Sequence, residues 1–104
     1  MFTFIETKLF TKLVQDYLSD EDYRLLQQTL ILNPDSGAVV KSSGGIRKIR
    51  WANKGREKRG AYRVVYFVRH SNNTIWMLTM YPKNLQDSIP GHILRQIREE
   101  IENE

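Results

Sequence analysis

The 104-residue chain contains no cysteine, so it cannot form a disulfide framework or a thiolate metal site. Nothing in its composition indicates an oxidising compartment. No apolar run approaches the roughly 20 residues that a membrane-spanning helix needs. The first residues lack the basic stretch of a secretory signal, and an acidic residue already follows at Glu6. The sequence therefore predicts a soluble, cytoplasmic protein that has no membrane partner.

Internal repeats and low-complexity tracts are also absent. The hydrophobic fraction of 40% and the charged fraction of 27% are typical of a globular protein and argue against disorder. A chain of this length buries enough surface to fold alone but leaves little room for a second unit. We therefore expect one domain that spans residues 1–104.

Motifs for nucleotide cofactors and metal ions are missing. The glycines match neither phosphate-binding spacing, and the Gly44–Gly45 pair precedes an expected strand instead of a helix. His70 and His92 are the only histidines, and neither has a carboxylate at a metal-ligand spacing. We therefore expect no cofactor and no metal ion. Either histidine can still act as an acid or base, but an exposed surface position is the interpretation that we favour.

Acidic residues are almost absent from the middle of the chain. Residues 47–69 contain nine basic residues and one acid, Glu57, so their net charge is +8; the whole chain carries +4, which leaves −4 for the remainder. This polarised charge predicts an anionic, phosphate-rich partner, RNA above all. For residues 54–59 a solvated loop tip is an equally good explanation. The nine basic residues are Arg47, Lys48, Arg50, Lys54, Arg56, Lys58, Arg59, Arg63 and Arg69.

Hydrophobic periodicity predicts an α+β fold. Apolar residues at helical spacing between Leu9 and Leu18 indicate one helix, and Ser19 is the expected cap of a second helix that ends at Asn33–Pro34. A final helix with an apolar stripe begins near Pro90. Strands are expected at residues 1–6, 47–52, 61–68 and 75–81, with a structured loop over 35–45 and a hairpin turn over 71–74. The predicted architecture is a small, mostly antiparallel sheet packed by an N-terminal helical hairpin and a C-terminal helix.

Two cations fall on one face of an expected strand. Lys48 and Arg50 lie two residues apart, so their side chains project together and can contact one phosphate track. Arginine can stabilise charge on a phosphorane-like transition state, and lysine supplies positive charge and a possible acid. Trp51, Tyr62 and Tyr66 are interleaved with these cations. Such aromatic rings can stack on bases, but core packing is the interpretation that we favour for Trp51 and Tyr66.

Several stretches of the chain resemble the HigB-like branch of the RelE toxin superfamily. The most specific feature is the spacing of Gly-Gly-x-Arg-Lys-x-Arg at residues 44–50 ahead of Gly-x-x-Arg-x-x-Tyr at residues 60–66. No single piece of this pattern is specific alone. The order of the expected elements fits the family along essentially the whole chain. The similar stretches are 32–34, Gly37, 44–50, 54–67 and 78–84.

The resemblance implies a RelE-like fold and a ribosome-dependent endoribonuclease that cleaves mRNA in the ribosomal A site and so inhibits translation. Basic residues in this family orient the RNA so that a 2′-hydroxyl attacks its own 3′-phosphate and leaves a cyclic phosphate. By motif position, Lys48 and Arg50 match the residues that contact and activate the RNA, and Arg63 matches the arginine that stabilises the transition state. Further RNA-binding residues are expected at Arg47, Lys54, Arg56, Lys58, Arg59, Lys83 and Asn84.

The chain departs from the family pattern at two places. Asp87 and Ser88 stand about where many RelE proteins carry a catalytic tyrosine or histidine, with His92 a turn further on. The general acid and base are therefore unassigned. Gly60–Ala61 replaces a frequent Gly-Gly pair, which stiffens the loop.

The resemblance also implies partners. Proteins of this kind are the toxin component of a type II toxin–antitoxin system, and the HigB-like branch pairs with an antitoxin that carries a helix-turn-helix domain. Contact with operator DNA is expected only through that antitoxin. The N-terminal hairpin and the final helix are candidate docking surfaces, although their apolar stripes fit a core better. Two alternatives stay open, a ParE-like toxin that binds gyrase and a non-catalytic RNA-binding module.

Overall fold

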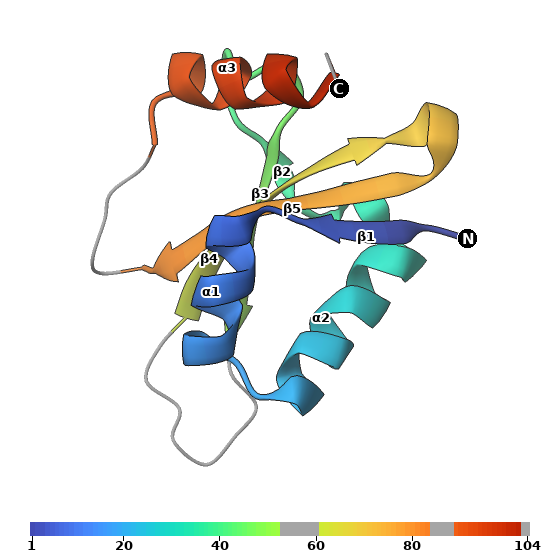
Figure 1. The fold of residues 1–104 in the computed structure, drawn as a ribbon, viewed down its shortest axis with the longest axis vertical. Helices are drawn as coiled ribbons and strands as arrows, with labels where there is room; N and C mark the ends of the chain where they lie inside the picture. The colour runs from blue at the N-terminus through green and yellow to red at the C-terminus, as the bar shows by residue number, and fades with distance from the viewer. Residues whose placement is uncertain (53–60, 84–88, 103–104) are drawn as a thin grey trace.

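The computed structural model describes residues 1–52, 61–83 and 89–102. Within them lies one sheet with the strand order β1-β5-β4-β3-β2, in which only the pairing of β1 with β5 is parallel (Figure 1). The elements are β1 (Thr3–Glu6), α1 (Lys8–Tyr17), α2 (Asp20–Leu32), η1 (Pro34–Ser36), β2 (Ala38–Val39), β3 (Arg47–Ala52), β4 (Ala61–Arg69), η2 (His70–Asn72), β5 (Thr74–Pro82) and α3 (Gly91–Glu102). The predicted α+β architecture is confirmed.

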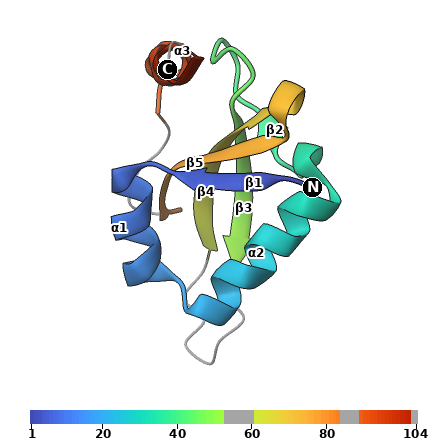
Figure 2. The same ribbon diagram turned by 45° about the vertical axis from the view of Figure 1, so that its right-hand side comes forward.

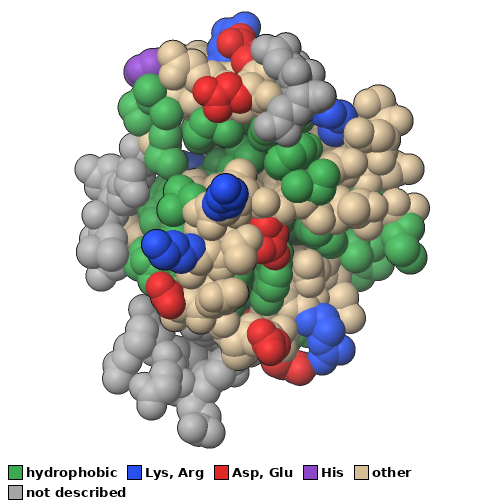
Figure 3. Space-filling model, in the orientation of Figure 1, with side chains coloured by type: hydrophobic (Ala, Val, Ile, Leu, Met, Phe, Trp, Pro, Cys, Tyr) green, Lys and Arg blue, Asp and Glu red, His purple; other side chains and the backbone are tan. Residues whose placement is uncertain are grey.

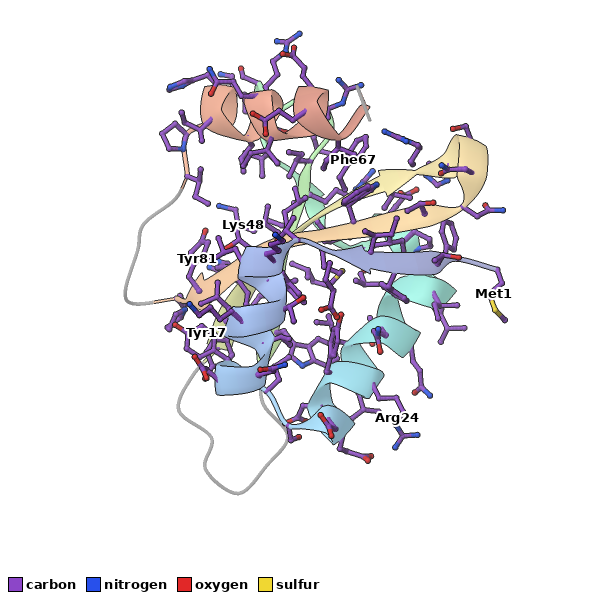
Figure 4. The ribbon with its side chains drawn as sticks, in the orientation of Figure 1. Met1, Tyr17, Arg24, Lys48, Phe67 and Tyr81 are labelled. Carbon is purple, nitrogen blue, oxygen red and sulfur yellow. The ribbon has the colours of Figure 1, made fainter. Side chains whose placement is uncertain are left out.

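The sheet separates two layers of helices (Figures 1 and 2). α1 and α2 cover one face, where Phe10 and Leu26 are buried in a cluster with side chains of β4 and β5. α3 covers the other face, where Leu94 and Ile101 share a second cluster with Phe67. Figure 4 shows Phe67 beneath α3. The apolar stripes of all three helices therefore contribute to the core.

Local capping sets where the first two helices begin. The Thr7 side chain accepts a hydrogen bond from the backbone N–H of Phe10 and donates one to the carbonyl of Leu78, so it both caps α1 and ties the helix to β5. Ser19 accepts from the N–H of Asp22, which confirms the predicted cap of α2. Three acidic residues in the first turn of α2 face the positive end of its dipole.

The segment expected to be a loop contains the short strand β2. Its two residues pair with β3, with Ala38 opposite Lys48 and Val39 opposite Arg47. The hydroxyl of Tyr66, buried in the core, accepts from the N–H of Gly37 and donates to the carbonyl of Pro34, at 2.8 Å each. Burial raises the pKa of Tyr66, which keeps this hydroxyl protonated as a donor. Tyr66 therefore fixes the turn that leads into β2.

The aromatic residues next to the basic strands pack on the face that α1 and α2 cover. The Tyr62 ring stacks on Tyr17 with 4.8 Å between centroids, and Trp51 packs against the same cluster. The packing interpretation is confirmed for Trp51 and Tyr66. In the described part of the chain, no helix combines the length and the apolar character that a bilayer crossing requires.

Candidate functional site

The register of β3 and β4 brings three cations onto one sheet face. Lys48 and Arg50 alternate with side chains of the opposite face along β3, and Arg50 lies directly opposite Arg63 on β4. Directly opposite residues in an antiparallel pair have Cβ atoms about 4.5–5.5 Å apart, and like charges at that separation repel. This is the same sheet face that α3 covers further along, because Val65, which is opposite Lys48, belongs to the α3 cluster.

The three cations border one open depression, which we call the basic hollow. Its volume is about 520 Å³, within the range of about 300–1,000 Å³ that ligand sites occupy. β2 closes the side away from β4. Lys48 and Arg50 belong to β3, and Arg63 belongs to β4. The hollow is lined by Ala38, Val39, Val40, Lys48, Arg50 and Arg63.

No acidic residue in the described part of the chain neutralises the positive charge of the basic hollow. Among residues 1–52, 61–83 and 89–102, none forms an ion pair or hydrogen bond with the side chain of Lys48, Arg50 or Arg63. By contrast, the side of the molecule shown in Figure 3 carries basic and acidic side chains close together. Adjacent unpaired cations at the mouth of a depression favour an anionic ligand with several oxygen acceptors, such as a phosphodiester.

Arg47 is separated from this set. It lies opposite Tyr66 and so projects from the sheet face that α1 and α2 cover. One of its Nη1 hydrogens bonds the carbonyl of Gly37 at 2.6 Å, and Nη1 also lies 3.1 Å from the carbonyl of Asp35. Its Nη2 is 3.4 Å from the Asp35 carboxylate. The side chain of Arg47, a predicted RNA contact, thus lies against the turn before β2 and bonds its backbone.

The remaining predicted RNA contacts are placed less fully. Lys83 is exposed. Its backbone N–H donates to the carbonyl of Ala61, the first residue of β4, so it continues the pairing of β5 with β4. It does not line the hollow. The other predicted contacts lie outside the described residues, and they are Lys54, Arg56, Lys58, Arg59 and Asn84.

Tyr81 is a neighbour of the site to which the sequence analysis gave no role. It lies directly opposite Arg63, on the same sheet face, and only 6% of its surface is exposed. Its hydroxyl is buried and has no hydrogen-bond partner among the residues that the structure describes. Figure 4 shows it toward the end of β5. Tyr81 lies two residues before Lys83, so the sequence alone could have placed it on the same strand face as that predicted RNA contact. Its position opposite Arg63, however, depends on the register between β4 and β5.

Neither histidine joins the basic hollow. His70 lies in η2, with Nε2 3.8 Å from the Asp35 carboxylate, and His92 is exposed on α3. Within the described ranges, no group of three or more His, Asp or Glu side chains is arranged to hold a metal ion. Asp87 and Ser88 lie outside these ranges. The described geometry therefore presents cations to a ligand and leaves the general acid and base unassigned.

Comparison with known proteins defines the class of fold. No protein-family model matches the chain. Its fold is similar to that of a RelE toxin from E. coli, a mutant in the free state, with a TM-score of 0.61 and 15% identity over 93% of this chain and 96% of that one. It is also similar to a chain of the archaeal RelE–RelB complex from Pyrococcus horikoshii OT3, with a TM-score of 0.55 and 21% identity over 82% of this chain and 98% of that one. The chain has the RelE-like fold.

Proposed function

We propose that this protein is the toxin of a type II toxin–antitoxin system, of the HigB-like branch, and that it cleaves mRNA in the ribosomal A site. The observation that carries the proposal is the convergence of Lys48, Arg50 and Arg63 on one hollow without acidic partners in the described part of the chain. The RelE-like fold and the spacing of residues 44–50 and 60–66 support the same conclusion.

The proposed reaction is an internal displacement at phosphorus. The 2′-oxygen of the RNA forms a bond to the adjacent phosphorus while its proton leaves, and the bond from phosphorus to the 5′-oxygen of the next nucleotide breaks. A proton is added to that 5′-oxygen, so the products are a cyclic phosphate and a free 5′-hydroxyl. Lys48 and Arg50 hold the backbone in position for this attack. Arg63 stabilises the negative charge that develops on the phosphoryl oxygens.

The proposal includes the partners of the site. The ribosome presents the mRNA as a single strand, and translation stops when the strand is cut. The archaeal RelE of similar fold is described in complex with RelB. We expect this chain to be held inactive by a helix-turn-helix antitoxin in the cytoplasm and to reach operator DNA only through it.

Cleavage coupled to translation tests the proposal. Purified protein added to an in-vitro translation reaction should cut the mRNA at codon positions, read as primer-extension stops, and the cut should require ribosomes. Lys48→Ala, Arg50→Ala and Arg63→Ala should each lower the rate at least about a hundredfold, the scale of losing one group that stabilises transition-state charge. Arg24→Ala is the matched control, because Arg24 is exposed and, among the described residues, pairs with Glu21 on its own helix.

The results separate the proposal from its alternatives. If the three variants merely bind RNA more weakly with a shallower salt dependence, and the wild type makes no cut, the protein is a non-catalytic RNA-binding module. Inhibition of gyrase supercoiling without any cut in the mRNA would identify a ParE-like toxin. Either result overturns the nuclease proposal.

A further inference from the structure

One row of side chains crosses the sheet beside the basic hollow. Arg50 on β3 lies directly opposite Arg63 on β4, and Arg63 lies directly opposite Tyr81 on β5. Directly opposite residues project from the same face of the sheet, so Tyr81 continues the row that the two arginines begin. Arg63 lines the hollow, whereas Tyr81 does not. Tyr81 is therefore a neighbour of Arg63 and not part of the wall that a ligand contacts.

Packing explains the ring of Tyr81 but not its hydroxyl. The ring belongs to the α3 cluster, and only 6% of the residue is exposed. A phenylalanine ring would fill the same space. The hydroxyl is buried and has no hydrogen-bond partner among the described residues, an arrangement that costs free energy. A buried polar group that neither packing nor a hydrogen bond accounts for is a candidate for a functional role.

Arg63 and Tyr81 have complementary hydrogen-bonding groups. A guanidinium only donates, and a phenol oxygen can accept. Within residues 1–52, 61–83 and 89–102, the Arg63 side chain forms no ion pair or hydrogen bond. Residues directly opposite each other have Cβ atoms about 4.5–5.5 Å apart, and both of these side chains are long. A rotation about side-chain bonds is therefore enough to join the two groups.

A bound phosphate would give Arg63 a need for this acceptor. Phosphate oxygens take two parallel N–H groups of a guanidinium, so the remaining N–H groups point elsewhere and lose contact with water. The other side chains that line the hollow cannot accept from them, because they are either aliphatic or, at Lys48 and Arg50, donors only. The oxygen of Tyr81, directly opposite Arg63, can accept.

We propose that Tyr81 is a positioning residue: when an anion occupies the basic hollow, its hydroxyl oxygen accepts a hydrogen bond from the Arg63 guanidinium and fixes the direction of the other N–H groups. Tyr81 does not touch the ligand and acts through Arg63. In the proposed cleavage, a guanidinium held in this way meets the charge that develops on the phosphoryl oxygens without having to reorient. The inference rests on the proposed function, because it specifies how the same site holds one of its groups.

The kinetics of Tyr81→Phe test this role. The substitution keeps the ring and removes only the hydroxyl. In cleavage coupled to translation, kcat should fall at least about tenfold, the scale of one hydrogen bond to a charged group, while KM for the ribosome–mRNA complex stays unchanged because no contact with RNA is lost. Tyr62→Phe is the matched control, since it makes the same change next to Arg63 but on the opposite sheet face, where the Tyr62 ring stacks on Tyr17. It should keep the wild-type kcat.

A double-mutant cycle shows whether Tyr81 acts through Arg63. In the Arg63→Ala background the guanidinium is gone, so Tyr81→Phe should lower kcat no further. Thermal unfolding of each variant checks that it is folded and that Tyr81→Phe is as stable as the wild type.

The Nε–H of Arg63 provides a readout that does not require cleavage. Its ¹⁵N–¹H signal can be assigned by its absence in Arg63→Lys. The probe is a short RNA strand with 2′-fluoro in place of every 2′-hydroxyl, which cannot be cut. Adding it should displace the signal in the wild type and in Tyr62→Phe, and the displacement should be smaller in Tyr81→Phe.

The results distinguish this inference from the proposed function. A wild-type kcat for Tyr81→Phe, an equal loss in the Arg63→Ala background or a clearly less stable Tyr81→Phe overturns the inference, while the function stands if the wild type cuts mRNA. If the wild type makes no cut, the function fails and the Arg63 signal decides: equal displacement in the wild type and Tyr81→Phe overturns the inference, and a smaller one supports it. A loss of kcat that disappears in the Arg63→Ala background supports both.

Discussion

At the scale of single residues, two buried tyrosine hydroxyls near the site differ in their hydrogen bonding. Tyr66 bonds two backbone groups, at Gly37 and Pro34, and so fixes the entry to β2. Tyr81 is also buried, but its hydroxyl has no hydrogen-bond partner within the described ranges. A buried polar group that is hydrogen-bonded contributes to stability, whereas one that is unpaired costs about 1–3 kcal/mol. The same chemical change should therefore have opposite consequences at the two positions.

Tyr66→Phe should lower the free energy of unfolding by about 1–3 kcal/mol, because it leaves the Gly37 N–H and the Pro34 carbonyl without their partner. Tyr81→Phe should leave it unchanged or raise it, since the ring remains and only an unpaired hydroxyl is lost. Urea titration of both variants and of the wild type measures the difference. A loss at Tyr81 as large as that at Tyr66 would show that the Tyr81 hydroxyl does have a structural partner.

At the scale of elements, one carboxylate joins the first strand to both N-terminal helices. Glu6 on β1 accepts from Thr11 of α1 and from the hydroxyl of Tyr23 of α2, each at 2.6 Å. Burial, followed by the hydrogen bond to Glu6 and the negative charge of that carboxylate, raises the pKa of Tyr23 far above its ordinary value. The hydroxyl must stay protonated for the three elements to remain connected.

Stability should consequently fall in alkaline solution. Because the folded-state pKa of Tyr23 is raised, its contribution is fully present below the unfolded value of about 10 and is lost as pH rises above it. Melting temperatures measured between about pH 8 and pH 11 should decline for the wild type. Tyr23→Phe should start lower, because the bond to Glu6 is gone, and decline less steeply. An identical decline in both proteins would assign the alkaline sensitivity to other groups.

At the scale of the whole molecule, charge is concentrated on one part of the fold. Residues 47–69 form the adjacent strands β3 and β4 and the segment between them, and they carry a net +8 in a chain of net +4. Within this region Arg50 and Arg63 lie directly opposite each other, and no acidic residue in the described part of the chain pairs with either of them. Opposed like charges destabilise a sheet, so the proposed binding site lowers the stability of the fold.

Arg63→Gln should therefore raise the free energy of unfolding by about 0.2–1 kcal/mol while it removes activity. A polyanion such as heparin should raise the melting temperature of the wild type, because a ligand that binds only the folded state stabilises it. The increase should be smaller for Arg63→Gln and unchanged for Arg24→Gln. If heparin stabilises all three proteins alike, the basic hollow is not where the polyanion binds.

Features that depend on neighbouring residues in the chain could be predicted from the sequence. Helical spacing and capping located α1 and α2, and the two-residue period of a strand placed Lys48 and Arg50 on one face. The same two-residue period already places Arg47 and Lys48 on opposite faces of the strand. The prediction of RNA contacts nevertheless included both residues. The charge excess of residues 47–69 likewise needed no coordinates.

Only the tertiary structure decided how distant segments meet. The position of Arg63 opposite Arg50 depends on the register between two strands, and one residue of slip would turn Arg63 to the other face. β2 is too short to show a period, and it forms because Tyr66, far along the chain, holds the preceding turn. The contribution of β2 to the basic hollow and the position of Tyr81 opposite Arg63 follow from these pairings. Local periodicity determines which face a side chain takes, whereas the partner across the sheet is set by contacts between residues far apart in sequence.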